Sequence, residues 1–267
     1  MGGFMRSIAI ASGKGGVGKT SFVINLALAL TQYHQKVIIF DADLGLANID
    51  VMLGISPKFD IRYVINGELS LKDIIYSTDY DFDFIPASSG VVELTNLNTN
   101  QKLLLKDQME EVFKKYDYLL FDSSAGISEN VLFFLYLAEE RIIICTPEPT
   151  SIADAYALIK VAYKNHKIKD FYLIVNMIKD EIEGKRIYQQ LLYVIERFLP
   201  EIKLSYLGGI PFDECVKIAI KSQIPYLKLC PEKEISQKIK QVALKLLKFN
   251  YQKTKSLENF LERLTTV

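Results

Sequence analysis

A short glycine-rich segment near the N-terminus has the residue types and the spacing of a phosphate-binding loop. Gly13 to Thr20 read GKGGVGKT, which satisfies the pattern G-x-x-x-x-G-K-[ST]. Glycines at these positions let backbone N–H groups turn inward onto phosphate oxygens, where side chains would collide. The lysine and the hydroxyl at the end of the pattern supply a charge for phosphates and a ligand for a metal ion. The segment therefore predicts binding of ATP together with Mg²⁺.

The surroundings of this loop support the prediction, because an apolar run precedes it and an amphipathic stretch follows. The N-terminus of the following helix would add its partial positive charge. Lys19 is predicted to reach the β- and γ-phosphates, and Thr20 to bind Mg²⁺. The alternative is a glycine-rich turn that matches by chance, which the flanking elements disfavour. The predicted nucleotide-binding residues of the segment are Gly13, Lys14, Gly15, Gly16, Val17, Gly18, Lys19, Thr20 and Ser21.

Acidic residues follow two of the apolar runs. Asp41 and Asp43 come directly after the predicted strand 36–40, and Asp122 follows the predicted strand 118–121. Carboxyl ends of neighbouring parallel strands meet at one crevice, where phosphates bind. Asp43 is predicted to orient the attacking water near Mg²⁺, and Asp122 to hold the metal directly or through water. Asp41 is expected to support them or to cap a turn. Taken singly, each aspartate could instead cap a helix.

Short apolar runs alternate with amphipathic stretches along most of the chain. Runs that are apolar throughout predict strands buried on both faces, and the helical stretches between them predict right-handed crossovers. The expected fold class is α/β, a doubly wound, mostly parallel sheet with helices on both faces. The predicted strands are 7–12, 36–40, 82–85, 118–121, 141–145, 171–175 and 204–210. The predicted helices are 21–32, 102–115, 152–163, 183–198, 234–249 and 257–264.

The bulk properties indicate one globular domain. No linker or repeat divides the chain, so one ATPase domain is expected over residues 1–250 and a tail helix within 251–267. Lys plus Arg and Asp plus Glu each total 32, which argues against gripping nucleic acid through overall charge. The longest apolar run, 131–138, is too short to span a membrane, and no signal peptide is visible. A cytoplasmic protein is expected, with at most peripheral membrane contact.

The three cysteines, Cys145, Cys215 and Cys230, are widely separated. No CxxC pair is present, so the spacing signals neither a zinc site nor an iron–sulfur cluster. Buried thiols in a reducing compartment are therefore the expected state of these residues.

Several segments resemble a known family. GKGGVGKT, with its second lysine, is similar to the loop of the deviant-Walker (ParA/MinD-like) ATPases. DADLGLANIDVMLG (41–54), IPASSGVVELTNL (85–97) and TPEPTSIADAYALIK (146–160) look like the flagellar-number ATPases called FlhG, also FleN or YlxH. Septum-placing MinD proteins match less well, since they usually carry an arginine where Ala47 stands. The resemblance covers nearly the whole chain.

The resemblance implies a homodimer that forms with ATP. In the family, the lysine equivalent to Lys14 crosses to the nucleotide of the partner, whereas the residues alone leave a solvated loop lysine as the alternative. Lys14, Lys19 and Asp43 are thus the predicted catalytic residues. Thr20, Asp43 and Asp122 are the predicted metal ligands.

The resemblance also places adenine contacts after two later strands. Asn176 follows the predicted strand 171–175, and Pro211 and Phe212 follow the predicted strand 204–210. An amide can donate to and accept from an adenine edge, and a proline ring can lie against the base. From the residues alone, a turn residue is an equally open interpretation of Asn176.

The C-terminal tail carries an apolar stripe on a predicted helix. Leu257, Phe260, Leu261 and Leu264 repeat at i, i+3, i+4 and i+7. The resemblance implies a reversible membrane-surface helix, which would need a dimer to double its marginal lipid affinity. The alternative is a terminal helix docked on its own domain.

The function implied by the resemblance is a slow Mg-dependent ATPase, acting as an ATP-dependent dimeric switch that controls flagellar number and placement. Its expected partners are the SRP-type GTPase FlhF, flagellar switch and C-ring components, and the anionic inner face of the cell membrane. Many FlhG proteins carry an Asp-Gln-containing motif ahead of the first strand that activates FlhF. Residues 1–6 show no such motif, so activation by that route is not expected.

Four other functions stay open from the sequence. A MinD-type septum-site regulator would share the chemistry and bind MinC instead. A ParA-like DNA-segregation ATPase would need a basic surface on the dimer. An iron–sulfur carrier is disfavoured by the missing paired cysteines. A nucleotide-locked adaptor would bind ATP without useful turnover.

Overall fold

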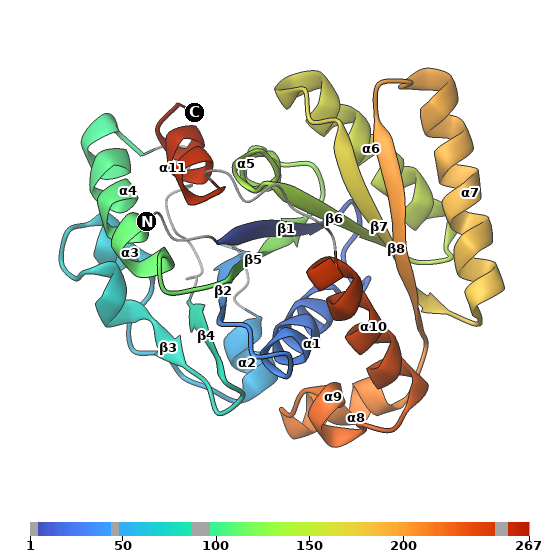
Figure 1. Ribbon diagram of the computed structural model, residues 1–267, viewed down its shortest axis with the longest axis horizontal. Helices are drawn as coiled ribbons and strands as arrows, with labels where there is room; N and C mark the ends of the chain where they lie inside the picture. Colours follow the sequence, from blue (N-terminus) through green and yellow to red (C-terminus); the bar gives the residue numbers. More distant parts are fainter. Residues whose placement is uncertain (1–4, 44–47, 87–96, 249–255, 267) are drawn as a thin grey trace.

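The computed structural model describes residues 5–43, 48–86, 97–248 and 256–266. Within these ranges the strands form one eight-stranded sheet in the order β3-β4-β2-β5-β1-β6-β7-β8, with helices on both faces (Figure 1). The paired strands are parallel except β3, which runs antiparallel to β4. The predicted doubly wound α/β fold is confirmed. Ala47, residues 87–96 of the second FlhG-like segment and residues 251–255 of the tail lie outside the described residues.

The strands in the middle of the sheet are buried along their whole length, as continuous apolar runs predict. β1 lies between β5 and β6, and the chain leaves it toward β2 on one side and later reaches β6 on the other. A crevice for a ligand is expected outside the carboxyl end of β1, where the strand order changes direction. The strands are β1 Arg6–Ser12, β2 Val37–Ala42, β3 Tyr76–Ser77, β4 Phe82–Ile85, β5 Tyr118–Ala125, β6 Glu140–Cys145, β7 Asp170–Ile178 and β8 Lys203–Pro211.

Four strands extend further toward this crevice than the sequence predicts, and one of them is β2, which contains Asp41 and ends at Ala42. Polar residues interrupt the apolar runs, but β5, β7 and β8 go on pairing with their neighbours beyond these residues. Asp122 lies inside β5 and Asn176 inside β7, and Pro211 is the last residue of β8. The prediction that these residues follow their strands is therefore wrong. The interpretation of Asn176 as a turn residue is wrong for the same reason.

Two hydrophobic cores lie on the two faces of the sheet. One face is covered by α1, α2, α8, α9 and α10, and the other by α3 to α7 and α11 (Figure 1). The six predicted helices are present. The sequence did not predict α5, which contains most of the apolar run 131–138, because this helix is buried on almost every side and shows no helical period. The helices are α1 Lys19–Thr31, α2 Ile49–Leu53, α3 Ile61–Ile65, η1 Leu71–Ile74, α4 Thr99–Phe113, α5 Glu129–Leu137, α6 Pro149–His166, α7 Glu181–Phe198, α8 Cys215–Ser222, α9 Tyr226–Leu229, α10 Glu234–Lys248 and α11 Ser256–Thr266.

The tail helix α11 is docked on the domain. Its apolar stripe is buried, and Phe260 packs against Phe121 and Phe113 at ring-centroid distances of 5.9 and 6.1 Å. Arg263 donates to the carbonyl of Ala138 at the end of α5, at 2.9 Å. The hydrophobic core shared with α3 to α7 covers the whole stripe in this structure: Leu257, Phe260, Leu261 and Leu264. The membrane-facing role predicted for the stripe stays a prediction. No described helix has the length and apolar character of a membrane span.

The cysteines differ from the expectation. Cys215 and Cys230 form a disulfide, although 15 positions separate them. Only Cys145 is a buried thiol, and burial raises its pKa to about 12. The prediction of three thiols is wrong because α8 and α9 fold back on each other, which no spacing rule could show.

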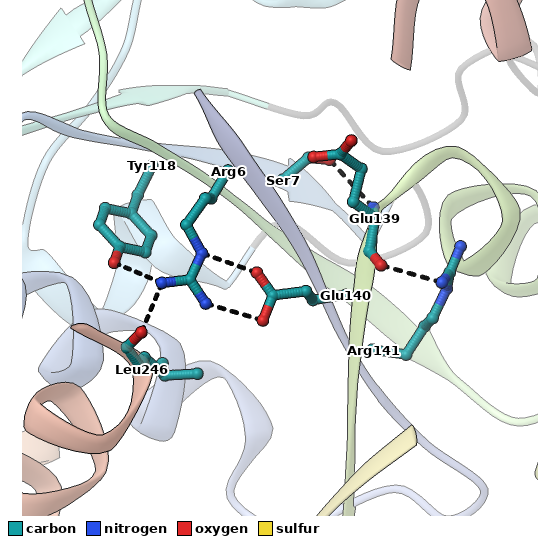
Figure 2. Close-up of polar contacts among 7 residues, drawn as sticks. All are labelled: Arg6, Ser7, Tyr118, Glu139, Glu140, Arg141 and Leu246. Atoms are coloured by element: carbon teal, nitrogen blue, oxygen red, sulfur yellow. Dashed lines mark hydrogen bonds and ion pairs between the residues drawn. The ribbon is translucent and has the colours of Figure 1, made fainter. Parts of the chain in front are cut away.

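A buried ion pair joins β1 to β6 at the amino ends of these strands, which is the side of the sheet opposite the crevice. Arg6 donates to both carboxylate oxygens of Glu140 at 2.8 Å and to the hydroxyl of Tyr118 at 2.9 Å (Figure 2). It also donates to the carbonyl of Leu246 near the end of α10. One guanidinium thus joins three strands and the last long helix of the first face.

Candidate nucleotide-binding site

The loop between β1 and α1 has the backbone that its glycines allow. Gly16 and Gly18 have φ angles of +77° and +84°, a region that other residues rarely adopt. Gly18 directly precedes α1, so the loop ends at a helix N-terminus. The arrangement can present backbone N–H groups and the helix dipole to an anion.

Other parts of the fold press on this loop. A Cβ atom at Gly13 would lie 2.3 Å from the carbonyl oxygen of Asp154 in α6, and a Cβ atom at Gly18 would lie 2.6 Å from the Asn176 amide nitrogen. The same amide donates to the carbonyl of Val17 at 2.7 Å. Strand β7 therefore holds the loop from one side and helix α6 from another. Larger residues at these two glycines would displace it.

Lys19 and Asp122 form the charged centre of the site. The register places Asp122 of β5 between Ile10 of β1 and Asp41 of β2. The Lys19 ammonium lies 3.5 Å from an Asp122 carboxylate oxygen, and both side chains are almost completely buried. Burial raises the pKa of Asp122, and the charge of Lys19 acts in the opposite direction.

Asp41 is a second buried carboxylate. Its oxygens accept from the backbone N–H groups of Asp43, at 3.1 Å, and Asn48, at 3.4 Å, so it caps the turn after β2. Burial first, and the neighbouring Asp122 second, raise its pKa to about 8. This carboxyl therefore supports the turn beside Asp122 through both of its oxygens.

The predicted metal ligands fit a magnesium ion. Both carboxylate oxygens of Asp122 are buried, and the groups that favour their charged form are the side chains of Lys19 and Thr20. Thr20 follows Lys19 in the first turn of α1, and Asp43 is close enough for its charge to affect the pKa of Asp122. Hydroxyl and carboxylate oxygens suit Mg²⁺, which takes its remaining ligands from phosphates and water. Within the described residues no group of three His, Cys, Asp or Glu forms a cage for a metal alone.

Lys14 contacts its own chain in this structure. Its ammonium pairs with Glu148 and donates to the Thr150 hydroxyl at 3.1 Å. Pro149 begins α6 between these two residues, at the helix position where a missing N–H costs nothing. The Lys14 and Glu148 side chains are 39% and 62% exposed, so the pair is accessible and weak.

A cavity of about 660 Å³ opens beside the loop. Its walls include the predicted adenine contacts Asn176, Pro211 and Phe212, together with Gly18 of the loop. The Phe212 ring is exposed and lies under the Lys217 ammonium, 5.5 Å from the ring centroid. An aromatic and a proline ring beside an amide could hold a planar base.

The structure thus brings the predicted residues together at the carboxyl ends of the strands. The tail stripe is the exception, since it lies on one face of the sheet. Sequence reasoning missed the residues that restrain them: Glu148, Thr150 and Asp154 at the start of α6, and Tyr226 in the cavity wall. The first three lie in the segment 146–160, whose resemblance to FlhG was the available signal.

Comparisons with known proteins agree with this geometry. The sequence profile of a family described as "AAA domain" matches residues 5–174. The antiactivator FleN of Pseudomonas aeruginosa is 38% identical over 90% of this chain and 85% of its own. The flagellum site-determining protein YlxH of Helicobacter pylori is 36% identical over 90% of this chain and 81% of its own.

The fold also matches solved structures. The septum site-determining protein MinD from Pyrococcus horikoshii, complexed with Mg-ADP, superposes with a TM-score of 0.75 at 24% identity. The match covers 94% of this chain and all of that one. At this identity the likeness shows the fold alone.

Proposed function

The chain belongs to the ParA/MinD-like family of P-loop ATPases and is similar to its flagellar members FleN and YlxH, and on this premise we propose that it is an ATP-dependent dimeric switch controlling flagellar number and placement. The observation that carries the proposal is the glycine loop with the buried Lys19–Asp122 pair at its end. This pair sets a cation and a buried carboxylate where a triphosphate and its metal would meet.

The chemistry follows from the residues around the loop. Loop amides and Lys19 would bind the β- and γ-phosphates, and Thr20, Asp122 and Asp43 would hold Mg²⁺. The bound ion supplies positive charge that neutralises the phosphates. Asp43 is proposed to orient the attacking water, since Asp41 is committed to the turn. We propose slow turnover, which suits a timer.

Dimerisation is the proposed signal. Lys14 would leave Glu148 and reach the nucleotide of a second copy, so that ATP lies between two protomers. An exposed ion pair contributes only about 0–1 kcal/mol, so little opposes this exchange. Hydrolysis and product release would then separate the copies.

Nucleotide binding is tested by titration calorimetry with Mg-ATP. Saturable binding is expected, together with phosphate release that requires Mg²⁺. Lys19→Ala should abolish phosphate release, because it removes the charge at the γ-phosphate. No heat at millimolar nucleotide would overturn the proposal.

The flagellar output is tested by pull-down of the ATP-loaded protein. We propose retention of FlhF and of flagellar switch or C-ring components. Retention of MinC in their place would support septum placement and contradict the flagellar role.

Peripheral association with the inner face of the cell membrane is proposed only for the ATP dimer. The stripe of α11 is buried, so α11 must leave its site before it can touch lipid. Co-sedimentation with anionic vesicles is expected to require a non-hydrolysable ATP analogue. Equal sedimentation without nucleotide would contradict this order of events.

A further inference from the structure

The disulfide Cys215–Cys230 closes a chain segment that forms one wall of the proposed base cavity. Cys215 opens α8 and Cys230 directly follows α9, so the bond joins the two ends of this pair of helices. Figure 1 shows α8 and α9 side by side, next to the foot of α10. Four residues between the two cysteines line the cavity: Val216, Lys217, Ile220 and Tyr226. Phe212 and Asp213, just ahead of Cys215, line it too.

The α9 end of the segment is anchored without the disulfide. The Leu227 N–H donates to the Asn25 side chain of α1 at 2.8 Å, in a fully buried contact. Tyr226 is 3% exposed and packs in the core of that face. Breaking the sulfur–sulfur bond would therefore leave α9 in place.

The α8 end is held by Cys215 and Ala219 in the core and, at its far end, by Gln223, which donates to the Val51 carbonyl at 2.9 Å; its start has weaker polar support. Asp213 accepts from the Cys215 N–H at 2.7 Å and pairs with Lys233 at 2.8 Å. This pair joins the segment before Cys215 to the segment after Cys230, as the disulfide does. The Lys233 side chain is 50% exposed, so this ion pair is a weak substitute for a covalent bond. Val216 and Lys217 follow directly, and Lys217 lies over the Phe212 ring. The Phe212 backbone keeps its own bond to the Ile178 carbonyl at 3.0 Å, so loss of the disulfide would loosen Val216 and Lys217, which cover the Phe212 ring side of the wall.

We propose that Cys215–Cys230 is a thiol-exchange site that sets the nucleotide affinity of the protein, with the oxidised form holding the base-binding wall closed. The inference rests on the proposed position of the base beside Phe212. A wall that is already ordered binds a planar base without the entropy cost of ordering it first.

The exchange is balanced with a dithiol as reductant. Cys215 is 1% exposed and Cys230 is partly exposed, so a thiolate of the dithiol attacks the sulfur of Cys230. The sulfur–sulfur bond breaks, Cys215 leaves as a thiolate and takes a proton. The second thiol of the reductant then displaces Cys230, and the reductant becomes a cyclic disulfide after giving up two electrons. Cys145 is buried in the other core and takes no part.

The test compares the oxidised and reduced wild-type protein by titration calorimetry with Mg-ADP and with tripolyphosphate. Thiols counted after denaturation should number one in the oxidised and three in the reduced form. Reduction is expected to raise the Kd for ADP roughly fivefold, as a loss of preorganisation. Tripolyphosphate affinity should stay unchanged, because it occupies the glycine loop alone and so also reports that the loop is folded.

Cys230→Ser provides the matched control. Its ADP affinity should equal that of the reduced wild type and should not respond to dithiol. Equal ADP affinities of the oxidised and reduced wild type would overturn the proposed role of the disulfide and leave the nucleotide function untouched. A parallel loss of tripolyphosphate affinity would overturn it as well, by showing a general loosening. Absence of ADP binding in both forms would instead overturn the nucleotide function on which it rests.

Discussion

Lys14 is the residue whose role depends most on what lies around it. In the structure its charge is matched by Glu148 of its own chain, whereas the proposed dimer gives it to the nucleotide of a second copy. The two uses exclude each other, because one ammonium group on one side chain cannot reach both places.

We expect Lys14→Ala to bind a non-hydrolysable ATP analogue and yet elute as a monomer in size-exclusion chromatography. The loop amides and Lys19 remain, but the charge that would cross the interface is lost. Glu148→Gln is the matched control, since it frees Lys14 and should leave dimerisation intact. Normal dimerisation of the alanine variant would remove the crossing lysine.

Asp41 is expected to make the ligand-free protein less stable as the pH rises. Its pKa is raised from 3.8 to about 8, so between these values the folded protein holds a proton that the unfolded chain has released. The free energy of unfolding therefore falls with increasing pH across this window and levels off above it.

Thermal unfolding followed from pH 5 to pH 8 tests the Asp41 prediction. Asp41→Asn should flatten the slope, because an amide does not titrate and still offers one of the two oxygens that accept from the turn. Asp107→Asn, at an exposed position of α4, should leave the slope as it is. An unchanged slope in the Asp41 variant would contradict the assignment.

At the scale of elements, a substitution in α11 can test whether this helix stabilises the fold or serves only to bind lipid. Phe260 is fully buried between Phe121 and Phe113, so Phe260→Ala is expected to lower the free energy of unfolding by roughly 3–5 kcal/mol. Urea denaturation measures this change, and Asn259→Ala on the same helix should have a small effect. A Phe260 variant of normal stability that no longer bound vesicles would show a helix used for lipid alone.

At the scale of the whole molecule, the Arg6–Glu140 pair joins the sheet to α10 (Figure 2). Arg6→Met is expected to cost roughly 3–5 kcal/mol in urea denaturation, because it leaves the Glu140 carboxylate buried without its cation. Arg6→Met combined with Glu140→Leu should recover most of that loss, since no charge is then stranded. A single variant as stable as the wild type would show that water reaches Glu140.

The parts of the fold that could be predicted are those written in local patterns. Apolar runs gave seven strands and helical spacing gave six helices, because burial selects residue types with the period of each element. Strand ends were predicted too early, since Asp122 and Asn176 interrupt the runs while the backbone goes on pairing. The helix α5 was missed because it is apolar around nearly its whole circumference and shows no period.

By itself, the sequence determined the fold class, the glycine loop and the position of Lys19 and Thr20 at the end of that loop. These features depend on residues a few positions apart. Only the tertiary structure shows that the tail helix is docked on the domain, which residues Lys14 contacts and which cysteines pair. Glu148 lies 134 positions from Lys14, and Asn176 lies 159 positions from Val17. Contacts at such separations form only when the faces of distant elements meet, and no local spacing records which faces these are.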